Sequence, residues 1–249
     1  MRRKWVIGNW KMHGSVADNR RLLDRVLTGT QDMRAAIGVC VPFPYLAQAA
    51  KLLAGTPLVW GAQNLAEFDA GAYTGEVSAT MLADFGCRLA LVGHSERRAL
   101  FGEDDATVGR KLAAVVRHGL TPVLCVGETL AERDAGVTES IVARQLDAVI
   151  DVAGLPALAR SVIAYEPVWA IGSGRTASAQ QAQAVHRFIR ERLAAHSREL
   201  AAALPILYGG SVKAANAGGL FAMPDIDGGL VGGASLVADE FVAICAAAG

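Results

Sequence analysis

Short apolar runs recur along the chain at nearly even spacing, and this spacing is the feature that most limits its fold. Eight runs in 249 residues give one about every 31 residues. They are Trp5–Gly8, Ile37–Val41, Leu58–Gly61, Leu89–Gly93, Pro122–Val126, Val162–Tyr165, Ile206–Tyr208 and Gly229–Val231. A β-strand with its crossover helix takes about 30 residues. The runs are apolar throughout rather than alternating, which is typical of parallel strands covered by helices. The spacing therefore predicts eight β-then-α units.

The segments between the runs have helical patterns. Residues 105–118 carry apolar side chains at positions 108, 112, 115 and 116, close to the spacing of one helix face. Similar patterns cover Ser140–Val152, Ser178–Leu200 and Leu236–Ala247, and Ser178 is a suitable N-cap. We expect one domain over residues 1–249, a single (β/α)8 barrel of eight parallel strands with outer helices. A doubly wound sheet of six strands is the alternative.

The composition excludes several classes of protein. Apolar residues make up 52% of the chain, and 24 basic residues balance 24 acidic ones. A neutral chain lacks the basic field that binding to nucleic acid or an anionic membrane requires. No apolar run approaches the length of a membrane span. The four cysteines have no metal or redox spacing, so we expect free, buried thiols, no metal site and a cytoplasmic protein.

Polar residues follow several of the apolar runs. In a parallel barrel the carboxyl ends of the strands meet at one face, where the active sites of such barrels lie. The residues at these ends are Asn9, Lys11, His94, Glu166, the Gly209–Ser211 turn, Gly232 and Gly233. Together they supply a cation, an imidazole, a carboxylate and small residues with free backbone N–H groups. This set predicts an acid/base enzyme.

Seven segments that include these residues resemble the triosephosphate isomerase family, in order along the whole chain. They are GNWKM (8–12), GAYTGE (71–76), VGHSERR (92–98), CVGE (125–128), AYEPVWAIG (164–172), YGGSV (208–212) and DIDGGLVGGASL (225–236). The resemblance implies a TIM barrel that interconverts dihydroxyacetone phosphate and glyceraldehyde 3-phosphate through an enediolate. It implies that Glu166 is the base and that His94 is a neutral electrophile at a helix start. Lys11 would be the cation, supported by Asn9, and no cofactor is implied.

The resemblance also implies further roles. The substrate phosphate would be held by backbone groups of Gly172, Ser211, Gly232 and Gly233. Residues 167–176 would form a lid, in which Ile171 would close over the Glu166 carboxylate together with Leu230 and raise its basicity. Ser95 and Glu96 would support the site. For Cys125 the sequence leaves packing and an indirect catalytic contribution equally open.

The long segment Gln63–Glu76 resembles the family's interlocking loop. The resemblance implies a homodimer in which Thr74 reaches the neighbouring subunit near Asn9 and Glu96. Three residues depart from the commonest family wording: His13 stands where Asn is frequent, Ser173 where Thr is frequent, and Arg175 where Lys is frequent.

Three other functions fit parts of the sequence. Residues 172–177 match the dinucleotide pattern G-x-G-x-x-A, but no second strand ends in an acidic residue about 20 positions later. A phosphosugar aldolase would need a strand-borne Schiff-base lysine or metal ligands, and only Lys11 lies at a strand end. A phosphosugar-binding barrel without activity would be expected to lack the base or the electrophile, whereas both Glu166 and His94 are present.

Overall fold

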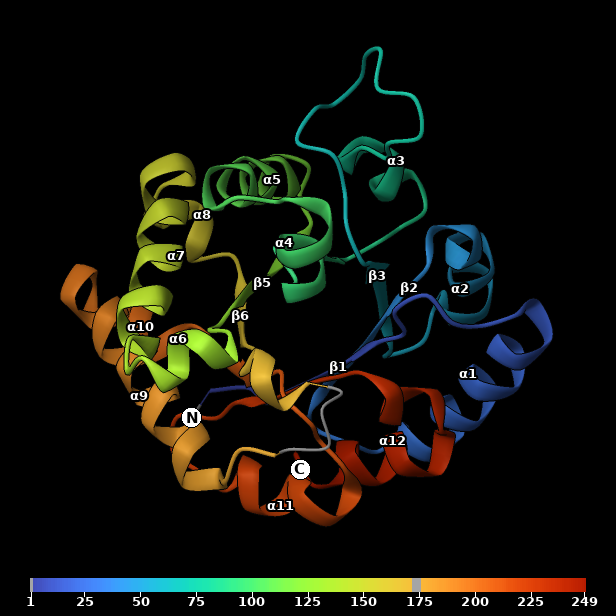
Figure 1. Ribbon diagram of the computed structural model, residues 1–249. Coiled ribbons are helices and arrows are strands. Elements are labelled where there is room, and N and C mark those ends of the chain that lie inside the picture. The colour runs from blue at the N-terminus through green and yellow to red at the C-terminus, as the bar shows by residue number, and fades with distance from the viewer. Residues whose placement is uncertain (1, 172–175) are drawn as a thin grey trace.

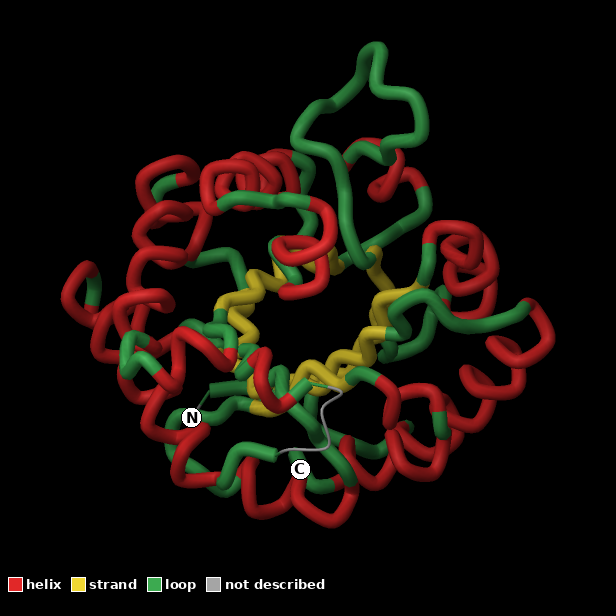
Figure 2. The backbone as a smooth tube through the Cα atoms, viewed as in Figure 1, coloured by secondary structure: helices red, strands yellow, loops and turns green. Residues whose placement is uncertain are grey.

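A closed ring of parallel strands forms the centre of the computed structural model, which describes residues 2–171 and 176–249. Within these residues eight strands follow one another in chain order, and β8 pairs with β1 to close the ring (Figure 2). The strands are β1 (Trp5–Asn9), β2 (Ala36–Val41), β3 (Val59–Ala62), β4 (Leu89–Val92), β5 (Thr121–Val126), β6 (Val162–Tyr165), β7 (Ile206–Tyr208) and β8 (Gly228–Val231). Each boundary lies within one residue of the predicted run. The barrel is therefore confirmed, and the doubly wound sheet is excluded.

Helices surround the ring (Figure 1). They are α1 (Val16–Thr30), α2 (Leu46–Leu53), α3 (Ala79–Asp84), α4 (Ser95–Phe101), α5 (Asp105–Arg117), α6 (Leu130–Asp134), α7 (Thr138–Ala153), α8 (Leu155–Leu158), α9 (Ala179–His196), α10 (Arg198–Ala203), α11 (Ala214–Phe221) and α12 (Ala238–Ala246), with the 3-10 turns η1 (Phe43–Tyr45), η2 (Val168–Ala170) and η3 (Gly233–Leu236). None of the helices in the described ranges has the length and apolarity needed to cross a membrane.

The predicted helix over Ser178–Leu200 was wrong in its extent. Its start is confirmed, because the Ser178 side chain accepts the Gln181 N–H and caps α9. The helix ends at His196, and Ser197 adopts an extended backbone with φ −159°. The Ser197 hydroxyl then accepts the Leu200 N–H and begins α10. A serine favours this cap over a helix interior because its hydroxyl competes for backbone partners.

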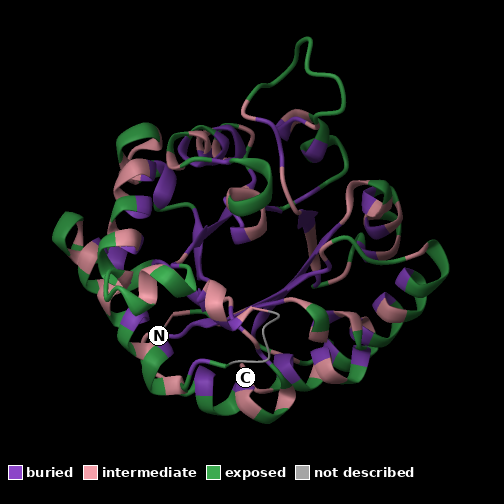
Figure 3. Ribbon diagram, in the orientation of Figure 1, coloured by how far each residue is buried: buried purple, intermediate pink, exposed green. Residues whose placement is uncertain are grey.

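Two apolar clusters hold the barrel. One contains alternate strand residues such as Leu89, Leu91, Val123 and Cys125. Because alternate residues of a strand share one face, this cluster fills the inside of the ring. The intervening residues, such as Leu124, pack outward in a larger cluster with the helices. Both faces of the strands are therefore covered, and the central strands are buried in Figure 3.

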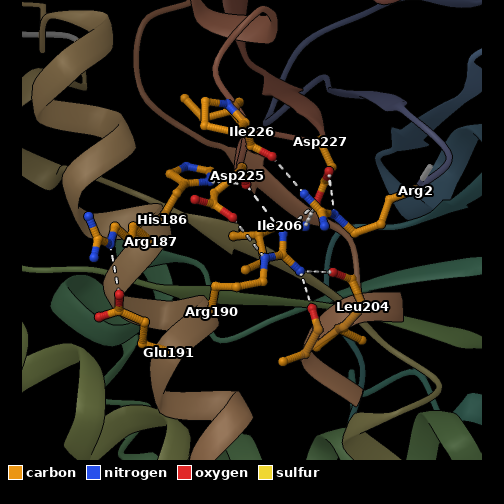
Figure 4. A network of polar contacts seen from close by, with 12 residues as sticks. Arg2, His186, Arg187, Arg190, Glu191, Leu204, Ile206, Asp225, Ile226 and Asp227 are labelled. Carbon is orange, nitrogen blue, oxygen red and sulfur yellow. Dashed lines mark hydrogen bonds and ion pairs between the residues drawn. The ribbon is translucent and has the colours of Figure 1, made fainter. Parts of the chain in front are cut away.

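Ion pairs connect α9 to the end of the ring where β8 begins (Figure 4). Arg190 of α9 donates to Asp225 and to Asp227, the residue before β8, at 3.3 and 2.7 Å. Asp227 also accepts Arg2 Nε at 2.8 Å and the Ile206 N–H at 3.0 Å. A buried carboxylate is stabilised when its oxygens have several donors. This network therefore fixes the end of the barrel opposite the predicted site.

Candidate active site

A cavity of about 340 Å³ opens at the carboxyl ends of the strands. The sequence-predicted residues that line it come from five βα connections or strands far apart in the chain. They are Asn9, Lys11, His94, Glu166, Ile171, Ser211, Leu230, Gly232 and Gly233. Gly172, Ser173 and Arg175 lie outside the described residues. The barrel thus gathers at one mouth nearly all the polar groups that follow the predicted runs.

Lys11 has an unusual backbone. Its φ is +52°, and it is the only non-glycine residue in the described ranges with a left-handed conformation. The Asn9 side chain at the end of β1 accepts the Lys11 N–H at 3.0 Å, which fixes this turn. The Lys11 ammonium lies 2.5 Å from a carboxylate oxygen of Glu96 and borders the cavity. A left-handed non-glycine residue costs about 1–3 kcal/mol. This backbone conformation places the Lys11 side chain at the edge of the cavity.

His94 is the N-cap of α4, and its ring has two different partners. Nδ1 accepts the Glu96 N–H at 3.2 Å. A neutral imidazole therefore carries its proton on Nε2, which lies 2.9 Å from Oε1 of Glu166. Burial disfavours the imidazolium, but the Glu166 carboxylate outweighs burial and raises the pKa of His94 above its ordinary value. In this position the Glu166 carboxylate acts against the neutral ring that the family resemblance implies, and the electrophile role of His94 stays a prediction.

The Glu166 carboxylate is buried and points toward the start of α4. It accepts the Ser95 N–H at 2.9 Å and the Ser95 hydroxyl at 3.4 Å. Burial favours its protonated form, but His94 and the Ser95 amide outweigh burial and lower the pKa of Glu166. This shift is opposite in direction to the increase in basicity expected when Ile171 and Leu230 enclose the carboxylate, and that expectation is not tested in this arrangement. The reason is that the carboxylate faces an imidazole and an amide rather than an apolar enclosure.

The ends of β5 and β6 approach each other closely beside this carboxylate. The Glu166 N–H donates to the Val126 carbonyl at 2.7 Å. A Cβ at Gly127 would lie 1.8 Å from the Glu166 carbonyl oxygen, so only glycine fits there. Cys125 of β5 is fully buried. Burial and the nearby Glu166 carboxylate raise the pKa of its thiol well above the ordinary value, which keeps it protonated.

Small residues line another part of the cavity. Ser211, Gly232 and Gly233 border it, and the short η3 turn begins at Gly233. A Cβ at Gly233 would meet nothing within 4 Å, so this backbone is open to a ligand. Backbone N–H groups in such turns suit an anion.

His13 and Lys213 also border this cavity. The sequence analysis noted His13 only because Asn is frequent at that position in the family, and it did not predict Lys213 as a site residue. Lys213 follows the seventh strand's glycine turn closely, and that position was the signal available for it. Among the described residues, no group of three His, Cys, Asp or Glu side chains is arranged to hold a metal ion.

A separate hollow of about 380 Å³ is bordered by some of the same residues. Asn9, Lys11, His94 and Glu96 line it together with Met12 and Phe101. Met12 is 94% exposed and Phe101 is 64% exposed. The β3–α3 connection, which carries the exposed Thr74, projects from the body of the chain at the top of Figure 1. The contact expected between Thr74 and a neighbouring subunit stays a prediction.

Comparison with known proteins assigns the chain to a family. The family model described as triosephosphate isomerase matches residues 4–248. A triosephosphate isomerase of Thiobacillus denitrificans is 65% identical over 248 residues, which cover 100% of this chain and 99% of that protein. One from Nitrosomonas europaea is 60% identical, covering 98% and 97%, and one from Dechloromonas aromatica is 58% identical, covering all of both chains. The resemblance of the seven segments is confirmed, and the chain belongs to the triosephosphate isomerase family.

Proposed function

We propose that this chain interconverts dihydroxyacetone phosphate and glyceraldehyde 3-phosphate in a single (β/α)8 domain in the cytoplasm. The observation that carries the proposal is that the Glu166 carboxylate, the His94 imidazole and the Lys11 ammonium border one cavity of about 340 Å³. The isomerisation moves a proton between adjacent carbons. One carboxylate can take that proton and return it, provided that the carbonyl oxygen is stabilised as it becomes negative.

Glu166 acts as the base after it leaves its contacts with His94 and Ser95. Ile171 and Leu230 also border the cavity, and their apolar side chains would enclose the carboxylate in the working position. Desolvation raises the pKa of a carboxylate, and the loss of the His94 and Ser95 contacts removes the largest influences that lower it. The movement therefore converts a paired carboxylate into a stronger base.

The same movement returns His94 to its neutral form. Burial is the largest influence on the pKa of His94 and lowers it, with a smaller contribution from Lys11, whereas Glu166 is the largest influence that raises it. When the carboxylate departs, burial favours the neutral ring. The Glu96 N–H still occupies Nδ1, so the ring presents its Nε2 proton to the cavity. That N–H donates to the two substrate oxygens of the enediolate, while the Lys11 ammonium stabilises their negative charge.

The substrate phosphate is held in the part of the cavity that the small residues line. The backbone N–H groups of Ser211, Gly232 and Gly233 are the proposed donors, and Gly172 joins them by resemblance to the family. Lys213 adds positive charge to the lining of this cavity. Closure of residues 167–176 over the substrate would exclude water and protect the enediolate from loss of phosphate.

A homodimer completes the proposal. The hollow beside Lys11 and His94 is lined by the exposed Met12 and Phe101, and an exposed loop of the same chain carries Thr74. Apolar side chains that are 94% and 64% exposed beside a site are favourable contacts for a second copy. Sedimentation of the purified protein, with Thr74→Arg as the variant, tests this. An active wild-type monomer would contradict it.

A coupled assay on the purified protein, without added cofactor, tests the reaction itself. Glu166→Gln removes the base but keeps the shape of the side chain, so we expect kcat to fall by at least about 100-fold with ligand binding retained. Full activity of this variant would show that another group is the base. Gly232→Arg should weaken binding of glyceraldehyde 3-phosphate much more than binding of unphosphorylated glyceraldehyde. An equal loss for both would contradict the phosphate assignment.

A further inference from the structure

The Arg98 guanidinium joins the ends of two strands beside the active site. Its Nε donates to the Gly93 carbonyl at 2.8 Å, and Nη2 donates to the Cys125 carbonyl at 3.3 Å. Nη1 lies 2.5 Å from Oδ1 of Asp105. Gly93 follows β4 and directly precedes His94, and Cys125 belongs to β5. One planar side chain thus fixes the backbone before the electrophile relative to the next strand.

The main chain around His94 is adapted to this contact. The Arg98 N–H donates to the His94 carbonyl at 3.2 Å, so Arg98 binds the two carbonyls on either side of the His94 residue. Gly93 has φ +70°. A Cβ at Gly93 would lie 2.8 Å from the Val108 methyl groups and 3.0 Å from Arg98 Nη2. The Gly93 turn therefore leaves the space that the guanidinium uses.

Arg98 is itself held from two further elements. Asp105 in the first turn of α5 accepts from Arg98, and its other oxygen accepts Arg144 Nε of α7 at 3.0 Å. The Arg98 side chain is 16% exposed and Asp105 is 19% exposed. A guanidinium is rigid and planar, so three hydrogen bonds from its fork fix both its position and its orientation. The ion pairs of Asp105 with Arg98 and Arg144 thus connect α4 to α5 and α7.

We propose that Arg98 is a positioning residue for proton transfer, and this inference rests on the proposed isomerase function. The start of α4 supplies both groups that bind the Glu166 carboxylate, the His94 imidazole and the Ser95 N–H. A shift of this start displaces the electrophile and the resting place of the base together. Catalytic groups must be held within about 0.5 Å, and a displacement of about 1 Å can cost about 100-fold in rate. The proposed phosphate-binding residues Ser211, Gly232 and Gly233 do not contact Arg98.

A second cavity makes this role testable by chemical rescue. It has a volume of about 360 Å³ and lies behind the site. Arg98, Gly93, Ser95, Cys125 and Glu166 are among its lining residues. Removal of the Arg98 side chain would open a vacancy toward this cavity. A small guanidinium ion from solution fits that vacancy and can donate to the Gly93 and Cys125 carbonyls and to Asp105.

The experiment compares Arg98→Ala and Arg98→Lys with the control Arg192→Ala. Arg192 forms an ion pair with Asp147 at 2.5 Å, away from the site. For Arg98→Ala we expect kcat to fall by about 10- to 100-fold, because His94 and the groups that bind Glu166 are displaced. We expect KM to change by less than about 3-fold, because the groups that bind the phosphate are not displaced. Millimolar guanidinium should restore at least part of kcat. Arg98→Lys keeps the positive charge but loses the forked arrangement of N–H donors. Its kcat should therefore lie between the values for wild type and Arg98→Ala. The control should keep the wild-type kcat with and without guanidinium.

Asp105→Asn is measured in parallel, because it weakens the anchor of Arg98 while both carbonyl contacts remain. A several-fold loss of kcat, again without a change in KM, supports the proposal. An unchanged kcat in folded Arg98→Ala, an equal effect on kcat and KM, or a loss that guanidinium does not relieve would overturn it. Wild-type protein without isomerase activity would instead refute the proposed function, so the two failures are distinguishable.

Discussion

Acidification from pH 7 to pH 5 is expected to destabilise the fold through one buried histidine. His186 of α9 is fully buried, and its Nδ1 lies 3.2 Å from the Asp225 carbonyl oxygen (Figure 4). Nδ1 therefore carries the proton of the neutral ring. Nε2 is buried and has no hydrogen-bond partner among the described residues. The Tyr165 ring lies edge-on at 5.8 Å. A second proton would place a charge on Nε2 where no acceptor receives it.

The size of this effect follows from the pKa. Burial lowers the pKa of His186 from 6.5 to about 4. The unfolded chain therefore binds a proton at a higher pH than the folded one does. The contribution of the neutral His186 ring to the free energy of unfolding is present above pH 6.5 and is lost as the pH falls toward 4. Below pH 4 this residue causes no further loss of stability. The full difference corresponds to about 3 kcal/mol, and the part lost between pH 7 and pH 5 is about 2 kcal/mol.

Urea unfolding at pH 7, 6 and 5 measures this loss. The matched variant is His186→Gln, whose amide can still donate to the Asp225 carbonyl but does not titrate. Protein concentration is held constant, because association changes apparent stability. Wild type should lose about 2 kcal/mol more than the variant between pH 7 and pH 5. Parallel pH profiles for the two proteins would show that His186 does not enter the fold as a buried neutral ring, and the reasoning would fail.

Three further substitutions test the site. Gly127→Ala places a methyl group against the Glu166 carbonyl, so it should lower the unfolding free energy by about 2 kcal/mol or more in urea and also lower kcat. Lys11→Met removes the cation and should lower kcat/KM by at least about 100-fold in the coupled assay, with an unchanged circular dichroism spectrum. Leu230→Ala should cost about 2–5 kcal/mol in urea unfolding and admit water to the base, so kcat should also fall. Wild-type stability for Gly127→Ala or Leu230→Ala, or wild-type kinetics for Lys11→Met, would contradict the respective assignment.

Much of the fold was predictable because local chemistry decides it. The eight strands were found within one residue, since a parallel strand covered on both faces must be apolar at every position. The start of α5 was also predictable, because Asp104 accepts the Thr107 N–H as an N-cap. The single long helix was the error. Its pattern continued past Ser197, and only the packing of α10 against α9 decided where the chain turned.

The residues of the site were predictable from their positions at the strand ends, but the contacts between their side chains were not. Asn9, Lys11, His94 and Glu166 follow apolar runs, and strand ends of a parallel barrel converge, so the sequence places them together. Lys213 was missed, although it lies at the same mouth. The role proposed for Arg98 was not predictable, because its side chain contacts the carbonyls of Gly93, which follows β4, and Cys125 in β5.

The amino-acid sequence by itself indicated eight parallel strands and the family, since these depend on periodicity and on motifs that can be recognised along the chain. Closure of the strands into a ring was decided by the tertiary structure. Only the tertiary structure decided the electrostatic state of the site. It placed Glu166 2.9 Å from His94 and against the Ser95 amide, which raises the pKa of His94 and lowers the pKa of Glu166. The physical reason is that a pKa depends on burial and on charges within a few ångströms. Those distances are set by how β4, β6 and α4 pack in space.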